Sequence, residues 1–245
     1  MNEIINRIRK SLIDYSDTIT KEKTVRLTSG AKCIGVTVPK IKELVKNYKQ
    51  EFAELDFQNA CEIADEFFIG KCREEILLSI FMLAGQKKKL TEIKWERIDN
   101  WLSSLDNWET CDQLSSNIVT PILVKKTDLI KNLFQLTKSD NKWKRRFAVA
   151  TAANINHGGR AFPKETFEIS KPLLTDKEKE VTKAVGWAIR EISKKCPKET
   201  FNFLEENIGQ ISKGLLKEAS ELLPEKERNE IMKIKETAVS KVLCK

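Results

Sequence analysis

The chain has 245 residues, of which 44 are Lys or Arg and 36 are Asp or Glu, so its formal net charge at neutral pH is +8. This length allows one sizeable hydrophobic core or an array of repeated units, and the basic excess favours a polyanionic partner, of which nucleic acid is the first to consider. The sequence has one histidine, no phosphate-binding glycine loop and no dinucleotide fingerprint, so we expect no cofactor, no metal site and no Ser-His triad.

The spacing of apolar residues predicts helices almost throughout the chain. Leu, Ile and Ala recur at intervals of three and four, and only nine glycines and six prolines interrupt them. We expect the stretch up to about Gly35 to form a capping helix and a loop. Pro39 is then expected to open the helix that carries Ile41, Leu44 and Val45.

The pentapeptide PKETF occurs at residues 163–167 and again at residues 197–201, a separation of 34 residues. In both copies the proline fits the first turn of a helix. Between the copies we expect one helix to about Leu174, a turn with a capping pattern at residues 175–178, and a second helix to about Lys195. Together these elements make one helical hairpin.

Further hairpins are predicted upstream of Pro163. Their first helices are expected to begin near Asp56, Thr91 and Thr127, which gives spacings of 35, 36 and 36 residues. Helix pairs that repeat at this length are typical of an all-α solenoid, in which the pairs stack into a superhelix with a concave face. Because no linker or change in composition divides the chain, we expect residues 1–245 to form a single domain.

The remaining features concern the end of the chain and its cysteines. Residues 224–245 are predicted to form a charged terminal helix. No close C-x-x-C pair occurs, so a buried free thiol is expected for each of Cys33, Cys61, Cys72, Cys111, Cys196 and Cys244. We find no signal-peptide pattern, no apolar run of transmembrane length and no disulfide framework, and we therefore expect a cytoplasmic protein without a membrane partner.

The first candidate site lies on the second helix of one predicted pair, at residues 107–118. If second helices line the concave face, their polar stripes are where a binding site is expected. Here Trp108, Asp112 and Ser115 share one stripe beside an apolar one. The alternative interpretation is a partly buried tryptophan, with Asp112 making a structural hydrogen bond.

The next second helix, residues 141–154, aligns Trp143, Arg146 and Ala150, and Arg145 stands beside them. Small residues around an arginine permit close approach of a bulky partner, and a guanidinium group matches a phosphate in a fork. The alternative interpretation is a solvated basic patch.

In the following pair, the segment KAVGWAIRE places Lys183, Trp187 and Arg190 one turn apart on a single helix face. Gly186 is expected to leave space next to the indole. Basic residues interleaved with an exposed aromatic suit a nucleic-acid backbone. The alternative is a core tryptophan flanked by cations whose stems lie along apolar surface.

With these segments the chain resembles the AlkD family of DNA alkylation-repair glycosylases, which are built from HEAT-like helix pairs. The resemblance covers most of the chain, in GVTVPKIKELVK, CREEILLSIFML, NWETCDQL, WKRRFAVAT and KAVGWAIRE. The W-x-x-x-D element of the family corresponds to Trp108 and Asp112. The arginine after W-x-x corresponds to Arg146, and the tryptophan of the A-x-G-W element to Trp187.

The resemblance implies hydrolysis of the N-glycosidic bond of N3- or N7-alkylated purines in DNA, without turning the lesion into a deep pocket. Such a base already carries a positive charge and leaves as a neutral molecule, so no general acid is needed. The sugar develops cationic character, which Asp112 is expected to stabilise while it positions the attacking water. The faces of Trp108 and Trp187 are expected to favour the same cation.

The resemblance also implies that the protein holds the DNA backbone, with Arg146 on a phosphate and supporting contacts from Arg145, Lys183 and Arg190. We expect a monomer that acts on double-stranded DNA containing alkylated purines. Two other functions stay open at this stage. One is a non-catalytic HEAT-like protein that recognises branched or distorted DNA, and the other is a protein-interaction scaffold.

Overall fold

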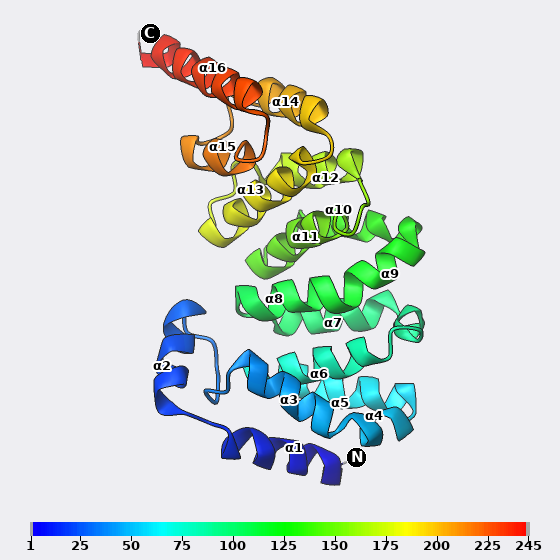
Figure 1. Ribbon diagram of the computed structural model, residues 1–245. Helices are drawn as coiled ribbons and strands as arrows, with labels where there is room; N and C mark the ends of the chain where they lie inside the picture. Colours follow the sequence, from blue (N-terminus) through cyan, green and yellow to red (C-terminus); the bar gives the residue numbers. More distant parts are fainter. Residues whose placement is uncertain (1, 244–245) are drawn as a thin grey trace. The chain divides into compact units, whose positions relative to one another are not determined.

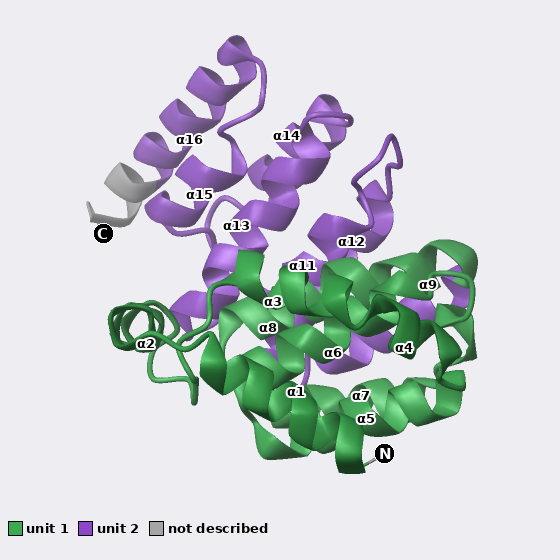
Figure 2. Ribbon diagram, turned by 60° about the horizontal axis from the view of Figure 1, so that its bottom comes forward, with its two compact units in different colours: residues 1–126 green, residues 127–245 purple. Residues whose placement is uncertain are grey.

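The computed structural model describes the backbone of residues 2–243 and the side chains of residues 2–238. Within residues 2–243 the chain is all-helical and contains no strand, as its apolar spacing predicts. It divides into two compact units, a first unit of residues 1–126 and a second unit of residues 127–245 (Figure 2). Among the described helices, none combines the length and the apolar character needed to cross a membrane.

The first unit consists of two layers of helices. Helix α5 packs against α6 and α7, while α6 packs against α3 and α8, so first helices and second helices of the pairs form separate layers (Figure 1). The elements are α1 (Asn2–Asp14), α2 (Thr18–Leu27), α3 (Val38–Asn47), α4 (Lys49–Glu54), α5 (Phe57–Gly70), α6 (Arg73–Gly85), the 3-10 turn η1 (Leu90–Glu92), α7 (Trp95–Ser104), α8 (Trp108–Leu114), the π-helical turn η2 (Ser115–Val119) and α9 (Thr120–Lys125).

The second unit repeats the same arrangement. Helices α10, α12 and α14 contact one another in turn, and α11, α13 and α15 form the other layer. The elements are η3 (Thr127–Ile130), α10 (Lys131–Leu136), α11 (Lys142–Asn154), α12 (Pro163–Ser170), η4 (Lys171–Leu173), α13 (Lys179–Ser193), α14 (Pro197–Glu206), α15 (Lys213–Ala219) and α16 (Glu225–Leu243). Stacked helix pairs within each unit confirm the predicted α-solenoid class.

The helix starts predicted near Asp56 and at Pro163 and Pro197 are confirmed. Pro163 and Pro197 are the first residues of α12 and α14. At the start of α5, the carboxylate of Asp56 accepts the backbone N–H of Gln58 at 2.9 Å. These signals act within one turn of helix, which is why the sequence alone identifies them.

Other boundaries differ from the expectation. The stretch before Gly35 forms two helices, α1 and α2, in place of one. The predicted starts near Thr91 and Thr127 are 3-10 turns, and the α-helices begin a few residues later. Residues 175–178 form the predicted turn between the two helices. The capping box expected there is wrong, because α13 begins only at Lys179 and its N-cap residue is Glu178.

The core follows the predicted apolar spacing. Ile41 and Leu44 of α3 are buried as expected. Between α5 and α7, the ring of Trp101 stacks on Phe68 with 5.0 Å between centroids. The indole N–H of Trp101 donates to the carboxylate of Asp65 at 2.7 Å, so the buried polar atom is satisfied. These contacts join the first helices of two successive pairs.

Among the described residues the cysteines form no disulfide. Cys33, Cys61, Cys72 and Cys111 are buried as predicted, and Cys196 is half-buried. The prediction for Cys244 lies outside the described residues.

Candidate functional site

One edge of α8 carries Trp108 and Asp112 a single turn apart, as helix periodicity predicts. The helix begins where Asn107 caps it, since the side-chain oxygen of Asn107 accepts the N–H groups of Glu109 and Thr110 at 3.1 and 3.0 Å. Trp108 is 39% exposed, and Asp112 is half-buried. The edge therefore presents an aromatic face and a carboxylate at the surface of the first unit.

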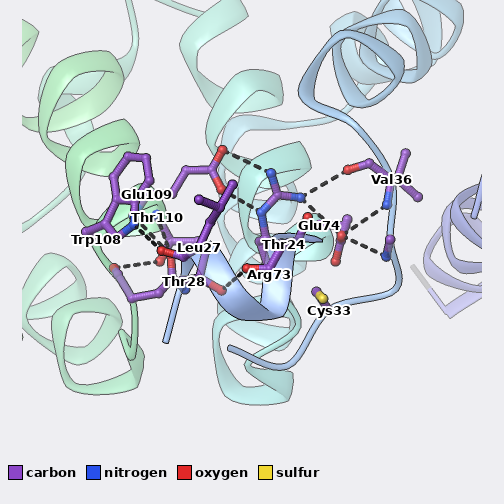
Figure 3. A network of polar contacts seen from close by, with 12 residues as sticks. Thr24, Leu27, Thr28, Cys33, Val36, Arg73, Glu74, Trp108, Glu109 and Thr110 are labelled. Atoms are coloured by element: carbon purple, nitrogen blue, oxygen red, sulfur yellow. Dashed lines mark hydrogen bonds and ion pairs between the residues drawn. The ribbon is translucent and has the colours of Figure 1, made fainter. Parts of the chain in front are cut away.

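The exposed indole of Trp108 is fixed at its N–H group. This group donates to the backbone carbonyl of Leu27 at 3.0 Å (Figure 3). Leu27 is the last residue of α2, which stands apart from the other helices of its unit (Figures 1 and 2). Within the described segment Thr18–Leu27 no residue is buried. Trp108 thus ties α8 to a helix that has little other packing.

The helix changes character directly after this edge. Thr120 donates its N–H to the carbonyl of Ser115, five residues back, which gives the π-helical turn η2. Pro121 follows and has no N–H to continue the α-helical pattern. Such turns are frequent at functional sites, and this one separates α8, which carries Trp108 and Asp112, from α9, which follows directly.

A buried cluster of charges lies behind Trp108, and the sequence analysis missed it. Arg73 pairs with the carboxylate of Glu109 in a planar fork, with Nε to Oε2 at 2.6 Å and Nη2 to Oε1 at 2.9 Å (Figure 3). Its third nitrogen, Nη1, donates to the carbonyl of Val36 at 3.0 Å and to Glu74 at 3.1 Å. One guanidinium group therefore connects α6, α8 and the loop before α3.

Glu74 holds that loop by its backbone. Its carboxylate accepts the N–H groups of Ile34, Gly35 and Val36 at 2.9, 3.0 and 3.2 Å. Gly35 has a φ of +101°, and a Cβ at this position would lie 2.5 Å from the backbone oxygen of Asp17. Only glycine fits, so the loop is fixed both by the carboxylate and by its close approach to the start of α2.

The groups of this cluster keep their protonation states at physiological pH. Burial lowers the pKa of Arg73, but the hydrogen bonds and charges of Glu109 and Glu74 outweigh burial, and the pKa is raised overall. Burial also raises the pKa of the Cys72 thiol to about 12, and this thiol donates to Glu74 with 3.6 Å between sulfur and oxygen. Arg73 therefore stays charged and Cys72 stays a neutral donor at physiological pH.

A sequence signal for this cluster exists at the start of α6. Arg73, Glu74 and Glu75 directly precede the apolar run of residues 76–83, and all of these residues are buried. Three charged residues at the head of a helix that is apolar on every side require partners. The partner Glu109 comes 36 residues later, so the sequence indicates the need for a partner and not its identity.

In the second unit, Arg145 is engaged within the protein. Its Nε and Nη2 pair with the carboxylate of Asp176 at 2.6 and 3.1 Å. Its Nη1 donates to the carbonyls of Ser139 and Asp140 at 2.8 and 3.0 Å. These bonds use four of the five N–H groups of a guanidinium. The DNA contact expected of Arg145 stays a prediction, with one N–H group left for it.

Arg146 is more buried than its expected role suggests. Its side chain belongs to a residue only 8% exposed, and Nη1 donates to the carbonyl of Glu180, in the first turn of α13, at 2.6 Å. Trp143, which precedes it by one turn, is also buried. The phosphate contact of Arg146 stays a prediction, and it would have to use the small part of this residue that is exposed.

Helix α13 carries the last three predicted site residues. Lys183 is exposed, and Trp187 is half-buried one turn later. Arg190 pairs with Glu221 at 2.9 Å and with Glu218 at 3.5 Å, both from the following helix pair. Lys183 is therefore the most exposed of these predicted DNA contacts.

The expectation that Gly186 leaves space next to the indole of Trp187 stays a prediction, and the structure gives this glycine a role in helix packing as well. A Cβ at Gly186 would lie 3.0 Å from Cγ of Glu218. The glycine therefore lets α15 approach α13 closely, and it serves packing between successive helix pairs.

The single histidine lies near Trp187, which the sequence did not indicate. His157 is followed by Gly158 and Gly159, which both have positive φ values. The ring of His157 lies 6.5 Å from that of Trp187, between centroids. Its Nε2 lies 3.5 Å from the carboxylate of Glu191.

The predicted site residues fall in both units. Trp108 and Asp112 lie together in the first unit, and the remaining residues, Arg145, Arg146, Lys183, Trp187 and Arg190, lie in the second. The convergence of the two sets on one groove stays a prediction. Among the described residues no group of three or more His, Cys, Asp or Glu side chains is arranged to hold a metal ion.

Comparison with known proteins gives one family, and the similar solved structures include the following two. The family model described as "DNA alkylation repair enzyme" matches residues 8–223. No curated protein matches. A structure described as a predicted DNA alkylation repair enzyme from Enterococcus faecalis is 17% identical, with a TM-score of 0.72, over 86% of this chain and 97% of that one. The crystal structure of smu.31 from Streptococcus mutans UA159 is 21% identical, with a TM-score of 0.53, over 80% and 90%. At these identities the two structures show a shared fold.

Proposed function

Because the chain belongs to the family of DNA alkylation repair enzymes, we propose that it is a glycosylase that hydrolyses the N-glycosidic bond of N3- or N7-alkylated purines in double-stranded DNA. Family membership supports a role in DNA repair and DNA as the partner. The observation that carries the finer proposal is the edge of α8, where an exposed tryptophan and a carboxylate lie one turn apart.

The chemistry requires stabilisation of a cation and little else. When the bond from the sugar carbon to the purine nitrogen breaks, both electrons go to the base, which loses its positive charge and leaves as a neutral molecule. The positive charge moves to the sugar. In the proposal Asp112 stabilises this charge and orients a water, whose oxygen bonds to the sugar carbon and whose proton is lost to the carboxylate or to solvent.

The aromatic residues act on the same cation in this proposal. A tryptophan face attracts a cation by its ring quadrupole and excludes water from it. The N–H of Trp108 is already bonded to Leu27, so its ring is held in one orientation. Trp187 is assigned the same role from the second unit. Arg146, Lys183, Arg190 and Arg145 are assigned to the DNA backbone, where phosphate contacts set position and not sequence.

The test is release of bases from methylated duplex DNA, measured by chromatography. We expect the wild type to release 3-methyladenine or 7-methylguanine. Asp112→Asn is expected to lower the rate by about a hundredfold or more, the effect of losing one preorganised charge partner, while DNA affinity is retained. Asp128→Asn, which changes an exposed carboxylate elsewhere in the chain, is the matched control and should behave as wild type. Absence of base release from the wild type would refute the proposal.

A second function is favoured by the net charge of +8, namely non-catalytic binding to branched or distorted DNA. The same experiment separates the two functions. Salt-dependent binding to branched duplexes without any base release would support the second function.

A further inference from the structure

Arg73 occupies a position that stability alone does not explain. It is the first residue of α6, where the helix dipole favours anions over cations. Its side chain is only 5% exposed, and buried ion pairs are often no more stabilising than apolar side chains of the same size. The geometry that the pair imposes is therefore the more important property.

The Arg73–Glu109 fork fixes the orientation of α8. Its two parallel hydrogen bonds, at 2.6 and 2.9 Å, allow the planar groups to meet in one orientation only. Glu109 is in the first turn of α8, directly after Trp108. A change in the fork would rotate or shift the turn that carries Trp108, and with it Asp112 one turn later.

The same guanidinium fixes the opposite side of Trp108. Through Val36 and Glu74 it is joined to the loop that follows α2, and Trp108 donates to Leu27 at the end of α2. Figure 3 shows these residues as one connected set between α2, α6 and α8. The position of the indole is thus defined from α8 on one side and from α2 on the other.

We propose that Arg73 and Glu109 are positioning residues, which hold Trp108 and Asp112 in the orientation that the site requires. They act through the first turn of α8 and through the loop before α3. The catalytic consequence rests on the proposed glycosylase function, whereas the structural consequence for Trp108 does not.

The structural consequence is tested by hydrogen exchange of the indole N–H groups, observed by NMR on protein labelled with nitrogen-15. In Arg73→Lys and in Glu109→Gln, which lose the fork and keep the size, exchange at Trp108 is expected to rise by about tenfold, as for loss of one modest hydrogen bond. The indole of Trp101, bonded to Asp65 at 2.7 Å, is the internal control and should not change. Normal protection of Trp108 in both variants would overturn the proposal.

A matched control is a second arginine fork, which reaches α6 from α1. Arg9 pairs with Glu75 of α6 through Nε at 3.0 Å and Nη2 at 3.3 Å, and this fork joins α1 to α6. Arg9→Lys removes a fork of the same kind without touching α8. Exchange at Trp108 is expected to stay at its wild-type rate in this variant, and a rise equal to that in Arg73→Lys would overturn the proposal.

The catalytic consequence is tested by single-turnover base release at saturating enzyme. Arg73→Lys and Glu109→Gln are expected to slow release by about ten- to a hundredfold, as small misplacements of a reacting group do, with DNA affinity within about twofold of wild type. A merely structural role would change affinity and rate together. If the wild type releases no base but exchange at Trp108 rises in the variants, the glycosylase proposal fails and the positioning role stands.

One further variant covers a loss of folding. If Trp101 also loses protection in the single variants, the apolar pair Arg73→Met with Glu109→Leu is expected to restore the fold. It removes both charges of the fork together, while Glu74 keeps its three backbone N–H donors. The fork is still absent, so fast exchange at Trp108 and slow base release are expected to persist. Wild-type exchange and wild-type release in this double variant would overturn the proposal.

Discussion

Each unit of the molecule contains an arginine fork that reaches forward to the next helix pair, and the two forks support different neighbours. In the first unit Arg73 pairs with Glu109, 36 residues on, in the first turn of α8. In the second unit Arg145 pairs with Asp176, 31 residues on, in the turn before α13. Both bonds therefore join one repeat to the next.

The two forks differ in the surroundings of their carboxylates, which belong to Glu109 and Asp176. Glu109 lies within the first turn of α8, directly beside Trp108, and Glu74 adds a buried carboxylate next to Arg73. Asp176 instead accepts the N–H of Glu178 at 2.9 Å and completes a turn. The fork of the first unit therefore supports an exposed aromatic residue, whereas the fork of the second unit stabilises the turn between two repeats.

The largest expected effect comes from removing the buried carboxylate of Glu74, which lies beside the first fork and bonds to the same guanidinium group. Glu74 is fully buried and accepts three backbone N–H groups as well as Arg73, so Glu74→Gln should lower the free energy of unfolding by about 3–5 kcal/mol, as for a broken buried ion pair. Urea unfolding measures this loss. Glu75→Gln, which changes the neighbouring carboxylate paired with Arg9, is the control and should cost less. Equal losses in the two variants would contradict the role assigned to Glu74.

The helix pairs could be predicted from the sequence because their signals are local. Apolar spacing, the prolines at Pro163 and Pro197, and the cap at Asp56 each act within one or two turns. Trp108 and Asp112 share an edge for the same reason, since residues four apart lie on one helix face. These parts of the structure needed no knowledge of distant contacts.

The partners of the charged residues could not be predicted in this way. Arg145 and Arg190 were both expected to contact DNA, yet each has an acidic partner 31 residues further along the chain. Arg73 received no role, although it organises the cluster behind Trp108. A sequence shows where a cation is, but the identity of its partner depends on how successive repeats stack.

A smaller effect tests whether the second fork is purely internal. Arg145→Met should lower the free energy of unfolding by about 1–3 kcal/mol, because Asp176 and two carbonyls lose their donor.

Whether Arg145 also contacts DNA follows from the salt dependence of duplex binding. Lys183→Ala should reduce the slope of log affinity against log salt by about one, the value for one lost phosphate contact. An equal reduction in Arg145→Met would show that the second fork also faces DNA.

The smallest expected effect is a loss, at low pH, of the stability that Asp176 of the second fork contributes. Burial raises the pKa of Asp176, but the hydrogen bonds from Arg145 and from the N–H of Glu178 outweigh burial, so the pKa lies below its ordinary value. The ordinary value of about 4 applies to the unfolded chain. The carboxylate therefore stabilises the fold above about pH 4, and this contribution is lost as the pH falls through the lowered pKa.

Thermal melting of wild type and Asp176→Asn at a series of pH values measures this contribution. Asparagine does not titrate, and the other carboxylates titrate in both proteins, so their effects cancel in the difference. The difference in Tm should be constant between about pH 5 and 7 and should shrink below about pH 4. A difference that stays constant to about pH 3 would mean that the charge of Asp176 adds nothing to the second fork. Hydrogen bonds to residue 176 would then stabilise the turn without a contribution from its charge. In that case the first fork would be an ion pair, and the second would act only as a set of hydrogen bonds.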